Sequence, residues 1–559
     1  MVEDKKILLI AFIAMVIAAV LSLLGPVLIG HTIDTYVQNK EMRGVLIFSG
    51  ILLGMYLISL VAGYLQAKLM GTVGQNMLYN LRNSLFSKLQ ELPLDFFNQN
   101  KSGDLISRIN NDTDKINQFF SQSLMQFVRS ILIMIGAAIF LLSINLPLGA
   151  AALAPAVVIW IFTRFISPWV KTRNVASLKS VGNLSSEVQE SLANFKVVVA
   201  FNRRDYFRRR FAEANEDNYK NAVKAGVANN LFVPVYTFFA NIGQMIVLTF
   251  GIYLIANQKF TVGLLISFIA YVTNFYNPLR QMAALWANFQ VALAAWDRIL
   301  KIINMQNNMP VNEDAKEIES GSIMAFRDVS FTYPDGTEVL HNINFKLEKG
   351  KTYAFVGPTG GGKTTTASLI ARLYDPTKGS VFLDGKDIRS YSPGEKAEKI
   401  GFILQEPYLF SGTVRENILY GNEKYQHFKN GELANIFREA GLEELLNGFD
   451  QGLETRVDSS SDGISLGQKQ LIAFMRAVLR KPELLILDEA TANIDTVTEK
   501  LLDDIMLKLP ATTTKVIIAH RLNTIADADE IFFINTGTMT RAGSLKEAVK
   551  MLMENKMAS

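Results

Sequence analysis

The 559-residue sequence contains no cysteine. This absence excludes disulfide bonds, zinc sites built from thiolates, and catalysis by a cysteine nucleophile. It also excludes redox chemistry through thiols. Any chemistry that the chain performs must therefore use other side chains.

Charge is scarce as well. Only 19% of the residues are charged, 49% are hydrophobic, and the mean hydropathy is +0.18. These values exclude a mainly disordered chain and indicate that part of the apolar surface faces lipid. The 56 Lys and Arg residues nearly balance the 52 Asp and Glu residues, which argues against nucleic acid as the main partner. At about 150 residues per domain, the length allows three to four domains.

Long uncharged runs predict six membrane-spanning helices. The first run, 7–30, would form a helix of about 36 Å, longer than the hydrocarbon core of about 30 Å. A cleavable signal peptide is the alternative, but the run is too long for its apolar part and further spans follow. Residues 130–163 hold two spans if Arg129 and Arg164 lie at the interfaces, because residues 145–149 form a turn signal. The other spans are expected at 44–67, at 225–258, and from 260 to 279 and beyond.

The connections between these runs alternate between short and long. The long ones, 68–129 and 164–230, are rich in Lys and Arg, so the positive-inside rule places them and both termini in the cytoplasm. Within the first of them, apolar residues recur at helical spacing at Leu81, Leu85, Leu89 and Leu92. We therefore expect membrane helices that extend far into the cytoplasm, since a structureless loop of that length is improbable in a compact protein.

Hydropathy falls after Ile303, which predicts three regions. They are a transmembrane domain at 1–305, a polar linker at 306–320, and a soluble domain at 321–559. In the soluble domain, strand-like runs at 352–356, 484–487 and 515–518 alternate with helical segments. This pattern is typical of an α/β domain with a largely parallel sheet.

A glycine-rich segment between an apolar strand and a helix carries the strongest motif. It consists of Gly357, Pro358, Thr359, Gly360, Gly361, Gly362, Lys363 and Thr364. In a P-loop of this pattern, backbone N–H groups surround phosphate oxygens, the lysine contacts the β- and γ-phosphates, and the threonine hydroxyl binds Mg²⁺. A structural glycine turn is the alternative. The expected fold class is thus a membrane α-helical bundle plus an α/β P-loop nucleotide-binding domain.

Two carboxylates follow the apolar run 484–487. They are Asp488 and Glu489, and such a pair at the end of a buried strand can hold a metal ion and orient a water molecule. Asp488 is expected to position Mg²⁺, and Glu489 to polarise the attacking water. A solvated acidic pair at the start of a helix is the alternative. The P-loop upstream favours the catalytic interpretation.

Three further segments resemble motifs of ATP-binding-cassette (ABC) transporters, in the same order and spacing. They are a Q-loop at 402–407, a signature at 464–468 and an H-loop at 519–520. With six spans ahead of one such domain, the chain resembles one half of an ABC exporter, an ATP hydrolase coupled to transport. The fold of that family places two halves together, with each ATP between the P-loop side of one domain and the signature side of the other.

The resemblance assigns roles to single residues. The catalytic residues it implies are Lys363, Gln405, Glu489 and His520, and the metal ligands are Thr364, Gln405 and Asp488. Tyr333 matches the aromatic residue that stacks on adenine, although an ordinary strand aromatic is the alternative. The other implied contacts to nucleotide come from Thr365 beside the P-loop, from Ser465, Gly467 and Gln468 of the signature, and from Asp495 of the D-loop.

The signature departs from the family pattern. Leu466 stands where the first glycine of Leu-Ser-Gly-Gly-Gln is expected, and 458–461 lacks the usual Gly-Glu pair. Leucine adds a bulky side chain where backbone must approach phosphate. Asymmetric members of the family, such as heterodimeric multidrug-type exporters, combine a weakened signature with an intact glutamate like Glu489. We therefore expect a heterodimer with a second half whose signature is intact; a homodimeric exporter or lipid flippase is the alternative, and a nucleotide-gated channel or regulator is a lesser one.

The resemblance also implies coupling segments. Phe96, Phe97 and 102–108 resemble the region of the first coupling loop, and 187–202 resembles the region of the second. Amphipathic helices with solvated charges are the alternative.

Polar residues in or near the last two predicted spans are candidates for a substrate pathway. They are Asn241, Gln244, Asn274, Arg280, Gln281, Trp286 and Asn288. Hydrogen bonding between helices is the alternative. We expect a small hydrophobic or amphipathic substrate, a lipid bilayer as the surroundings, and a prokaryotic cytoplasmic membrane as the location.

Overall fold

The structure is a computed structural model that describes residues 5–306, 309–312, 321–458, 464–488, 496–518 and 527–558. Its contacts divide the chain into two compact units. One comprises Met1–Gln90 and Ser102–Met305, and the other comprises Glu91–Lys101 and Gln306–Ser559. The short segment Glu91–Lys101 therefore packs with the second unit, although in sequence it interrupts the first.

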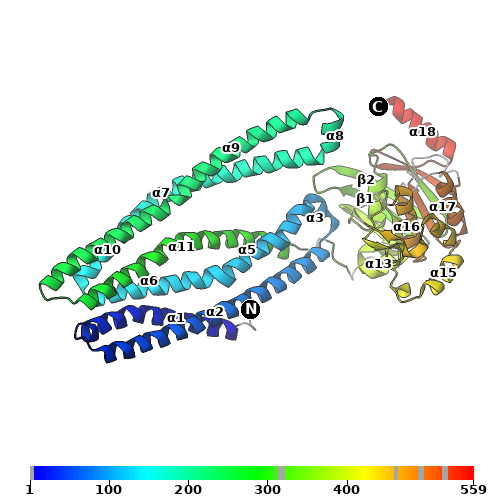
Figure 1. The fold of residues 1–559 in the computed structure, drawn as a ribbon. Helices are drawn as coiled ribbons and strands as arrows, with labels where there is room; N and C mark the ends of the chain where they lie inside the picture. Colours follow the sequence, from blue (N-terminus) through cyan, green and yellow to red (C-terminus); the bar gives the residue numbers. More distant parts are fainter. Residues whose placement is uncertain are drawn as a thin grey trace. The chain divides into compact units, whose positions relative to one another are not determined.

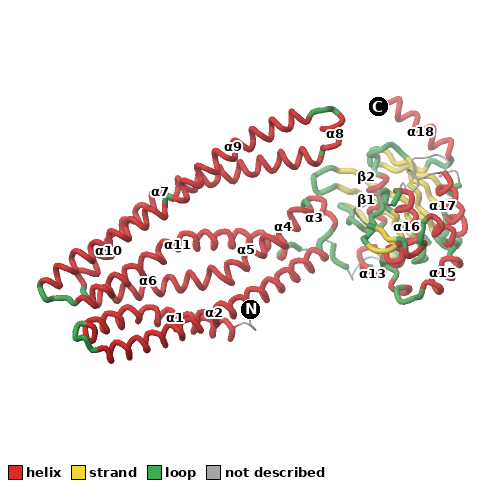
Figure 2. Tube along the Cα trace, in the orientation of Figure 1, coloured by secondary structure: helices red, strands yellow, loops and turns green. Residues whose placement is uncertain are grey.

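The first unit consists of long helices (Figure 1, Figure 2). Six helical stretches are long and apolar enough to cross a membrane, which confirms the six predicted spans. Their apolar parts lie in α1 (Lys5–Thr32), α2 (Met42–Glu91), α6 (Leu124–Ile144), α7 (Leu146–Ala193), α10 (Phe232–Ala256) and α11 (Val262–Ile303). The turn predicted near 145–149 is confirmed as a break at Asn145, whose side chain caps α7 by accepting from the backbone N of Leu148 at 3.0 Å.

Both long connections are helical, as predicted. The third span is extended by α4 (Ser102–Ser107), η2 (Arg108–Asp112), α5 (Thr113–Gln118) and η3 (Phe119–Ser123). In the other connection, α7 and α9 (Arg204–Asn230) run side by side and are joined at one end by the short helix α8 (Phe195–Ala200) (Figure 1). The cytoplasmic position of these extensions stays a prediction.

Small residues and paired polar groups hold the helices of this unit together. A Cβ atom on Gly263 of α11 would lie 2.0 Å from the carbonyl oxygen of Gly30 on α1, so this crossing requires glycine. Farther along α11, Arg298 donates two hydrogen bonds of 2.7 Å to the buried carboxylate of Asp112 in η2. Such charge-assisted pairs satisfy groups that would otherwise be costly to bury.

The second unit is an α/β domain with two main sheets. The first is antiparallel and has the order β2 (Glu338–Leu347), β1 (Met324–Thr332), β4 (Lys378–Leu383), β5 (Lys386–Asp387). The second has the order β12 (Thr538–Arg541), β11 (Glu530–Asn535), β3 (Thr352–Val356), β10 (Thr514–Ile518), β9 (Leu484–Asp488), β6 (Ile400–Ile403). Apart from β12, its strands are parallel, and the three predicted strands are confirmed to within one residue.

Two large hydrophobic clusters and a smaller one stabilise the described part of this domain. One joins residues of both sheets through packed aromatic rings, including Phe326, Phe345, Phe355 and Phe532. The other large cluster surrounds α14 (Val414–Leu419), α15 (Asn430–Glu439) and α16 (Leu466–Val478). Strand β3, which precedes the glycine-rich loop, contributes to the first cluster and α16 to the second, and strands β6, β9 and β10 contribute residues to both.

Candidate nucleotide site

Four neighbouring parallel strands bring the predicted catalytic segments to one edge of the sheet. The P-loop follows β3, Gln405 follows β6, Asp488 ends β9, and β10 ends at Ile518. Ile518 pairs with both Phe355 and Asp488, so the strands end together. Ligands of α/β domains bind at such carboxyl ends of parallel strands. The predicted residues Glu489, His520 and Asp495 lie outside the described residues.

The P-loop depends on its glycines. A Cβ atom on Gly357 would lie 1.9 Å from the carbonyl oxygen of Ile534, so any other residue would displace the neighbouring strand. Gly362 has a φ of +110° directly before α12 (Lys363–Ile370), a conformation that glycine adopts without strain. Lys363 is 6% exposed, and its Nζ donates to the carbonyl oxygens of Gly357 at 3.0 Å and Pro358 at 2.9 Å. The positive charge therefore lies against the loop, where phosphate would bind.

Two of the three predicted metal ligands lie together. Thr364 Oγ1 donates to Asp488 Oδ1 at 3.3 Å, and Asp488 is only 2% exposed. A hydroxyl and a carboxylate supply the oxygen ligands that Mg²⁺ prefers, so this pair fits the ion. Gln405, the third predicted ligand, has an exposed side chain in the loop after β6.

Tyr333 follows β1 and contacts the helix that carries the P-loop. Its hydroxyl lies 3.0 Å from Thr365 Oγ1. Its ring makes edge-to-face contacts with Phe331 and Tyr374, with centroid distances of 4.8 and 5.5 Å. The structure thus brings the predicted residues Tyr333, Thr365 and the P-loop together.

The signature forms the start of α16. Ser465 caps the helix, because its Oγ accepts from Gln468 N at 3.1 Å while Gln468 Oε1 accepts from Ser465 N at 2.9 Å. Gly467 and Leu466 occupy the first turn, and the side chain of Leu466 is 39% exposed. A well-formed helix N-terminus is therefore present, with a leucine side chain projecting from its first residue.

Sequence analysis placed Phe96 and Phe97 of α3 (Leu94–Gln99) in the first coupling region, but it did not identify the pair of residues that joins α3 to the second unit. Asn98 Nδ2 donates to the hydroxyl of Tyr374 at 2.8 Å, across 276 positions of sequence. Burial raises the pKa of Tyr374, and burial also raises the pKa of Asp95 on the same short helix. No pattern in the sequence indicates this pair, because neither residue belongs to a recognisable motif.

Three of the predicted pathway residues form hydrogen bonds between helices. Gln244 donates to Thr273 at 3.0 Å, Gln126 to Gln281 at 3.2 Å, and Asn288 to Ser123 at 3.2 Å. These contacts favour the structural alternative for Gln244, Gln281 and Asn288. Arg280 has an exposed side chain, and Trp286 is 52% exposed beside Phe289.

Comparisons with known proteins agree with this architecture. The ABC transporter transmembrane region matches residues 8–279, and the ABC transporter family, which describes the ATP-binding domain, matches residues 340–492. An uncharacterised ABC transporter ATP-binding protein of Bacillus subtilis, YfiC, is 32% identical over 98% of this chain and 90% of its own length. A fatty acid ABC transporter ATP-binding/permease protein of Mycobacterium bovis is 34% identical over 89% of this chain and 78% of its own length.

A solved structure shows the same fold. A bacterial Atm1-family ABC exporter with ATP bound superimposes with a TM-score of 0.82, at 23% identity, over 99% of this chain and 98% of that one. The matched families cover both the helical unit and the nucleotide-binding domain. The chain therefore belongs to the ABC transporters, as an exporter half-transporter whose ATPase domain is coupled to transport across a membrane.

Proposed function

We propose that this chain is the catalytic-glutamate-bearing half of a heterodimeric ABC exporter, with one hydrolytic and one degenerate ATP site. The observation that carries the proposal is Leu466, exposed at the first position of α16. The family pattern has glycine there, because the backbone of the signature must approach phosphate closely.

The structure of α16 supports binding without efficient turnover at the degenerate site. The first-turn N–H groups of a helix attract anions, and the Ser465 cap leaves this end of α16 well formed. A leucine side chain beside those groups would hold phosphate farther from them than glycine does. Electrostatic stabilisation of a transition state depends on preorganised donors at short distance, so hydrolysis suffers more than binding.

The hydrolytic site would combine this chain's P-loop with the signature of the partner. Lys363 would neutralise phosphate charge, Glu489 would polarise the water, and His520 would hold the γ-phosphate geometry. Mg²⁺ would be held by Thr364, Asp488 and Gln405, and when bound it would stabilise negative charge on the phosphates. Tyr333 would stack on adenine. The nucleotide site also includes Thr365 and the P-loop residues Gly357, Pro358, Thr359, Gly360, Gly361 and Gly362, and Asp495 would face the partner.

A second half-transporter also accounts for exposed apolar surface on α8. Phe195 and Val197 are each more than half exposed, and Phe201, at the end of the helix, is 75% exposed. Exposed apolar residues of this kind mark protein interfaces. The nucleotide-binding domain offers a groove of about 100 Å³ lined by Phe402, Leu404, Pro407, Ala473, Arg476 and Arg480. We propose that α8 of each half docks in the corresponding groove of the other.

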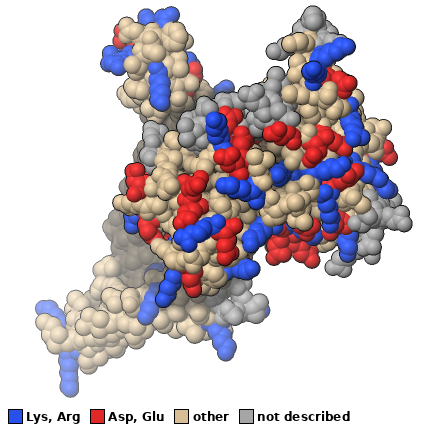
Figure 3. Space-filling model, turned by 90° about the vertical axis from the view of Figure 1, so that its right-hand side faces the viewer, with Lys and Arg blue, Asp and Glu red and all other residues tan. Residues whose placement is uncertain are grey.

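We propose a small hydrophobic or amphipathic substrate and a location in the cytoplasmic membrane. The exposed side chain of Arg280 on α11 and the fatty acid transporter among the relatives support an amphipathic molecule. Nucleic acid is not proposed as a partner, because the net charge is only +4 and charges of both signs are interspersed on the surface in Figure 3.

A substitution series at Leu466 tests the asymmetric sites. The chain alone, purified in lipid, should hydrolyse Mg-ATP slowly. Leu466→Gly should raise that rate about tenfold or more, because it restores close approach of donors to phosphate. Leu466→Ala is the matched control and should give a smaller increase, since its Cβ remains. Brisk hydrolysis by the parent chain that Leu466→Gly leaves unchanged would contradict the heterodimer and support a homodimer that tolerates leucine.

A further inference from the structure

The last four membrane spans contain no acidic residue. Asp and Glu are absent from 115–186 and from 218–296, which hold the apolar parts of α6, α7, α10 and α11. Basic residues do occur in both segments, among them Arg129 on α6 and Arg280 on α11. No carboxylate of these four spans is therefore available to neutralise either arginine.

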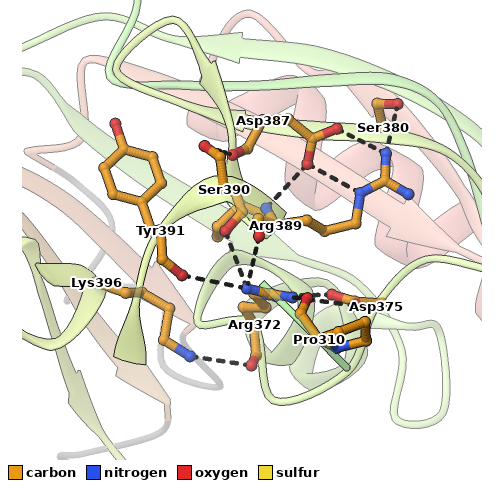
Figure 4. A network of polar contacts seen from close by, with 10 residues as sticks. Pro310, Arg372, Asp375, Ser380, Asp387, Arg389, Ser390, Tyr391 and Lys396 are labelled. Carbon is orange, nitrogen blue, oxygen red and sulfur yellow. Dashed lines mark hydrogen bonds and ion pairs between the residues drawn. The ribbon is translucent and has the colours of Figure 1, made fainter. Parts of the chain in front are cut away.

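Arginines of the nucleotide-binding domain illustrate the usual arrangement. Figure 4 shows Arg372 beside Asp375 and Arg389 beside Asp387, with nitrogen-to-oxygen distances of 2.9 and 2.6 Å. By contrast, the two arginines of the membrane spans make no hydrogen bond or ion pair with any residue that the structure describes, although the one on α6 is partly buried. An unpaired cation at membrane depth is costly, so it marks a site that is completed by something else.

Arg129 and Arg280 lie at the same level of two neighbouring helices. Helices α6 and α11 pack side by side, and Gln126 Nε2 donates to Gln281 Oε1 at 3.2 Å across them. Arg129 follows Gln126 by one helical turn, and Arg280 directly precedes Gln281. Because the two helices run in opposite directions, both steps lead toward the middle of the membrane, and the two positive charges stay at one depth.

This level lies toward the predicted cytoplasmic side of the hydrocarbon core. From the outer helix ends, the distance along the helix is about 27 Å to Arg280 and about 22 Å to Arg129, in a core of about 30 Å. Exposed amide side chains surround the same level, at Gln126, Asn277 and Gln281. Polar side chains within spans face the interior of a bundle or a water-filled cavity rather than lipid. The group therefore has the character of a polar binding site.

We propose that Arg280, together with Arg129 and the neighbouring amides, binds the head group of an amphipathic anion in the transport pathway. The inference rests on the proposed function, because it assigns the charge of the amphipathic substrate. Guanidinium and amide N–H groups donate hydrogen bonds to a carboxylate or a phosphate, whereas a cationic head group meets no carboxylate in these four spans. The apolar residues that make up the rest of the spans accommodate the tail.

The absence of cysteine allows a single fluorescent label beside this site. Ala284→Cys places an environment-sensitive bimane at an exposed position one turn after Arg280, in the full chain in phosphatidylcholine nanodiscs. Laurate, dodecyl phosphate and dodecyltrimethylammonium have tails of nearly equal length, so separate titrations compare their head groups. At least one of the two anions should give a saturable change in emission, with a Kd about tenfold or more below that of the cation. The tighter anion identifies the head group as a carboxylate or a phosphate.

Substitutions locate the response. Arg280→Gln should raise the Kd of the anion about tenfold, the loss expected for one charge-assisted hydrogen bond, and Arg280→Lys should raise it less because the charge remains. Arg129→Gln should raise it about threefold, since this side chain is less accessible. Arg164→Gln is the matched control, because Arg164 is also exposed and also lies about 27 Å from the outer end of its helix, α7. It should change the Kd by less than about twofold, as an independent site does.

Each other outcome counts against the proposal. Equal or tighter binding of dodecyltrimethylammonium, or an unchanged Kd in Arg280→Gln, would overturn the anion site. An equal loss in Arg164→Gln would also overturn it, because the arginines would then act only as anchors at the membrane interface. These results would leave the proposed ATP sites and heterodimer intact, since Mg-ATP turnover tests those separately. No saturable response to any of the three molecules would contradict the amphipathic substrate itself.

Discussion

Two short helices, α3 and α8, each connect two longer helical stretches of the chain, yet they differ in how far their apolar side chains are buried. In α3, Phe96 is 6% exposed and Asn98 bonds to Tyr374 of the nucleotide-binding domain. In α8, Val197 is 54% exposed, and Phe201 at its end is 75% exposed. The difference shows that α3 completes its contacts within its own chain, and it agrees with the proposal that α8 docks on a second half-transporter.

The largest expected effect comes from the apolar surface of α8. Phe195→Asp combined with Phe201→Asp should abolish docking on the partner, because each places a charge in a contact that would exclude water. Copurification of the partner and the ATPase rate of the complex should each fall more than about tenfold, on the order of the loss when a central interface residue is removed. Tyr219→Asp, at a 67% exposed aromatic position on α9, is the matched control and should have little effect. A stable, active complex carrying both aspartates would contradict the docking of α8 on the partner.

A smaller effect is expected at α3. Phe96→Ala should destabilise the docking of this helix by about 3 kcal/mol, the typical cost of removing a buried phenyl ring. Phe97 is 39% exposed, and Phe97→Ala should cost well under half as much. Hydrogen exchange of the backbone amides of residues 94–99 measures the loss of stability in each of the two variants. Equal protection in the two variants would mean that α3 is not held by its buried ring.

The smallest effect concerns pH. Burial raises the pKa of Asp95, and Oδ1 has no hydrogen-bond partner among the described residues. When α3 is packed against the nucleotide-binding domain, the protonated carboxyl of Asp95 is therefore favoured. The packing of α3 should be most stable at low pH and should lose stability as the pH rises from 3.8 through the raised pKa of Asp95. Asp95→Asn should remove this dependence and protect α3 better than the parent at neutral pH. Identical pH profiles of exchange in the parent and the variant would rule out a role for this carboxyl.

Sequence patterns were sufficient to predict a helix, strand or loop where a single physical requirement determines its residues. The run 352–356 is apolar because β3 is buried on both faces, and it is followed by glycines that a phosphate loop needs. The same argument located β9 with Asp488 at its end and β10 before His520. Membrane spans were predictable because lipid demands long uncharged helices, and the break at Asn145 followed from its turn residues.

Contacts between distant residues could not be predicted in this way. The polar segment 306–320 has the composition of a linker, but residues 309–312 are bonded to the domain through Arg372 and Arg389. Asn98 and Tyr374 meet only because α3 lies against the turn that follows the P-loop helix. The π-helical turns η2 and η3 could not be predicted from the sequence pattern either. In η2, the buried carboxylate of Asp112 is paired with Arg298, which lies on a helix far along the chain.

The most direct test of the account is the mass and Mg-ATP turnover of the chain purified alone in lipid, with Glu489→Gln as the control. The account predicts that the chain alone forms only a weak homodimer and hydrolyses Mg-ATP slowly, and that a half-transporter with an intact signature raises the rate. A stable homodimer that hydrolyses ATP rapidly, and loses that activity in Glu489→Gln, would contradict it.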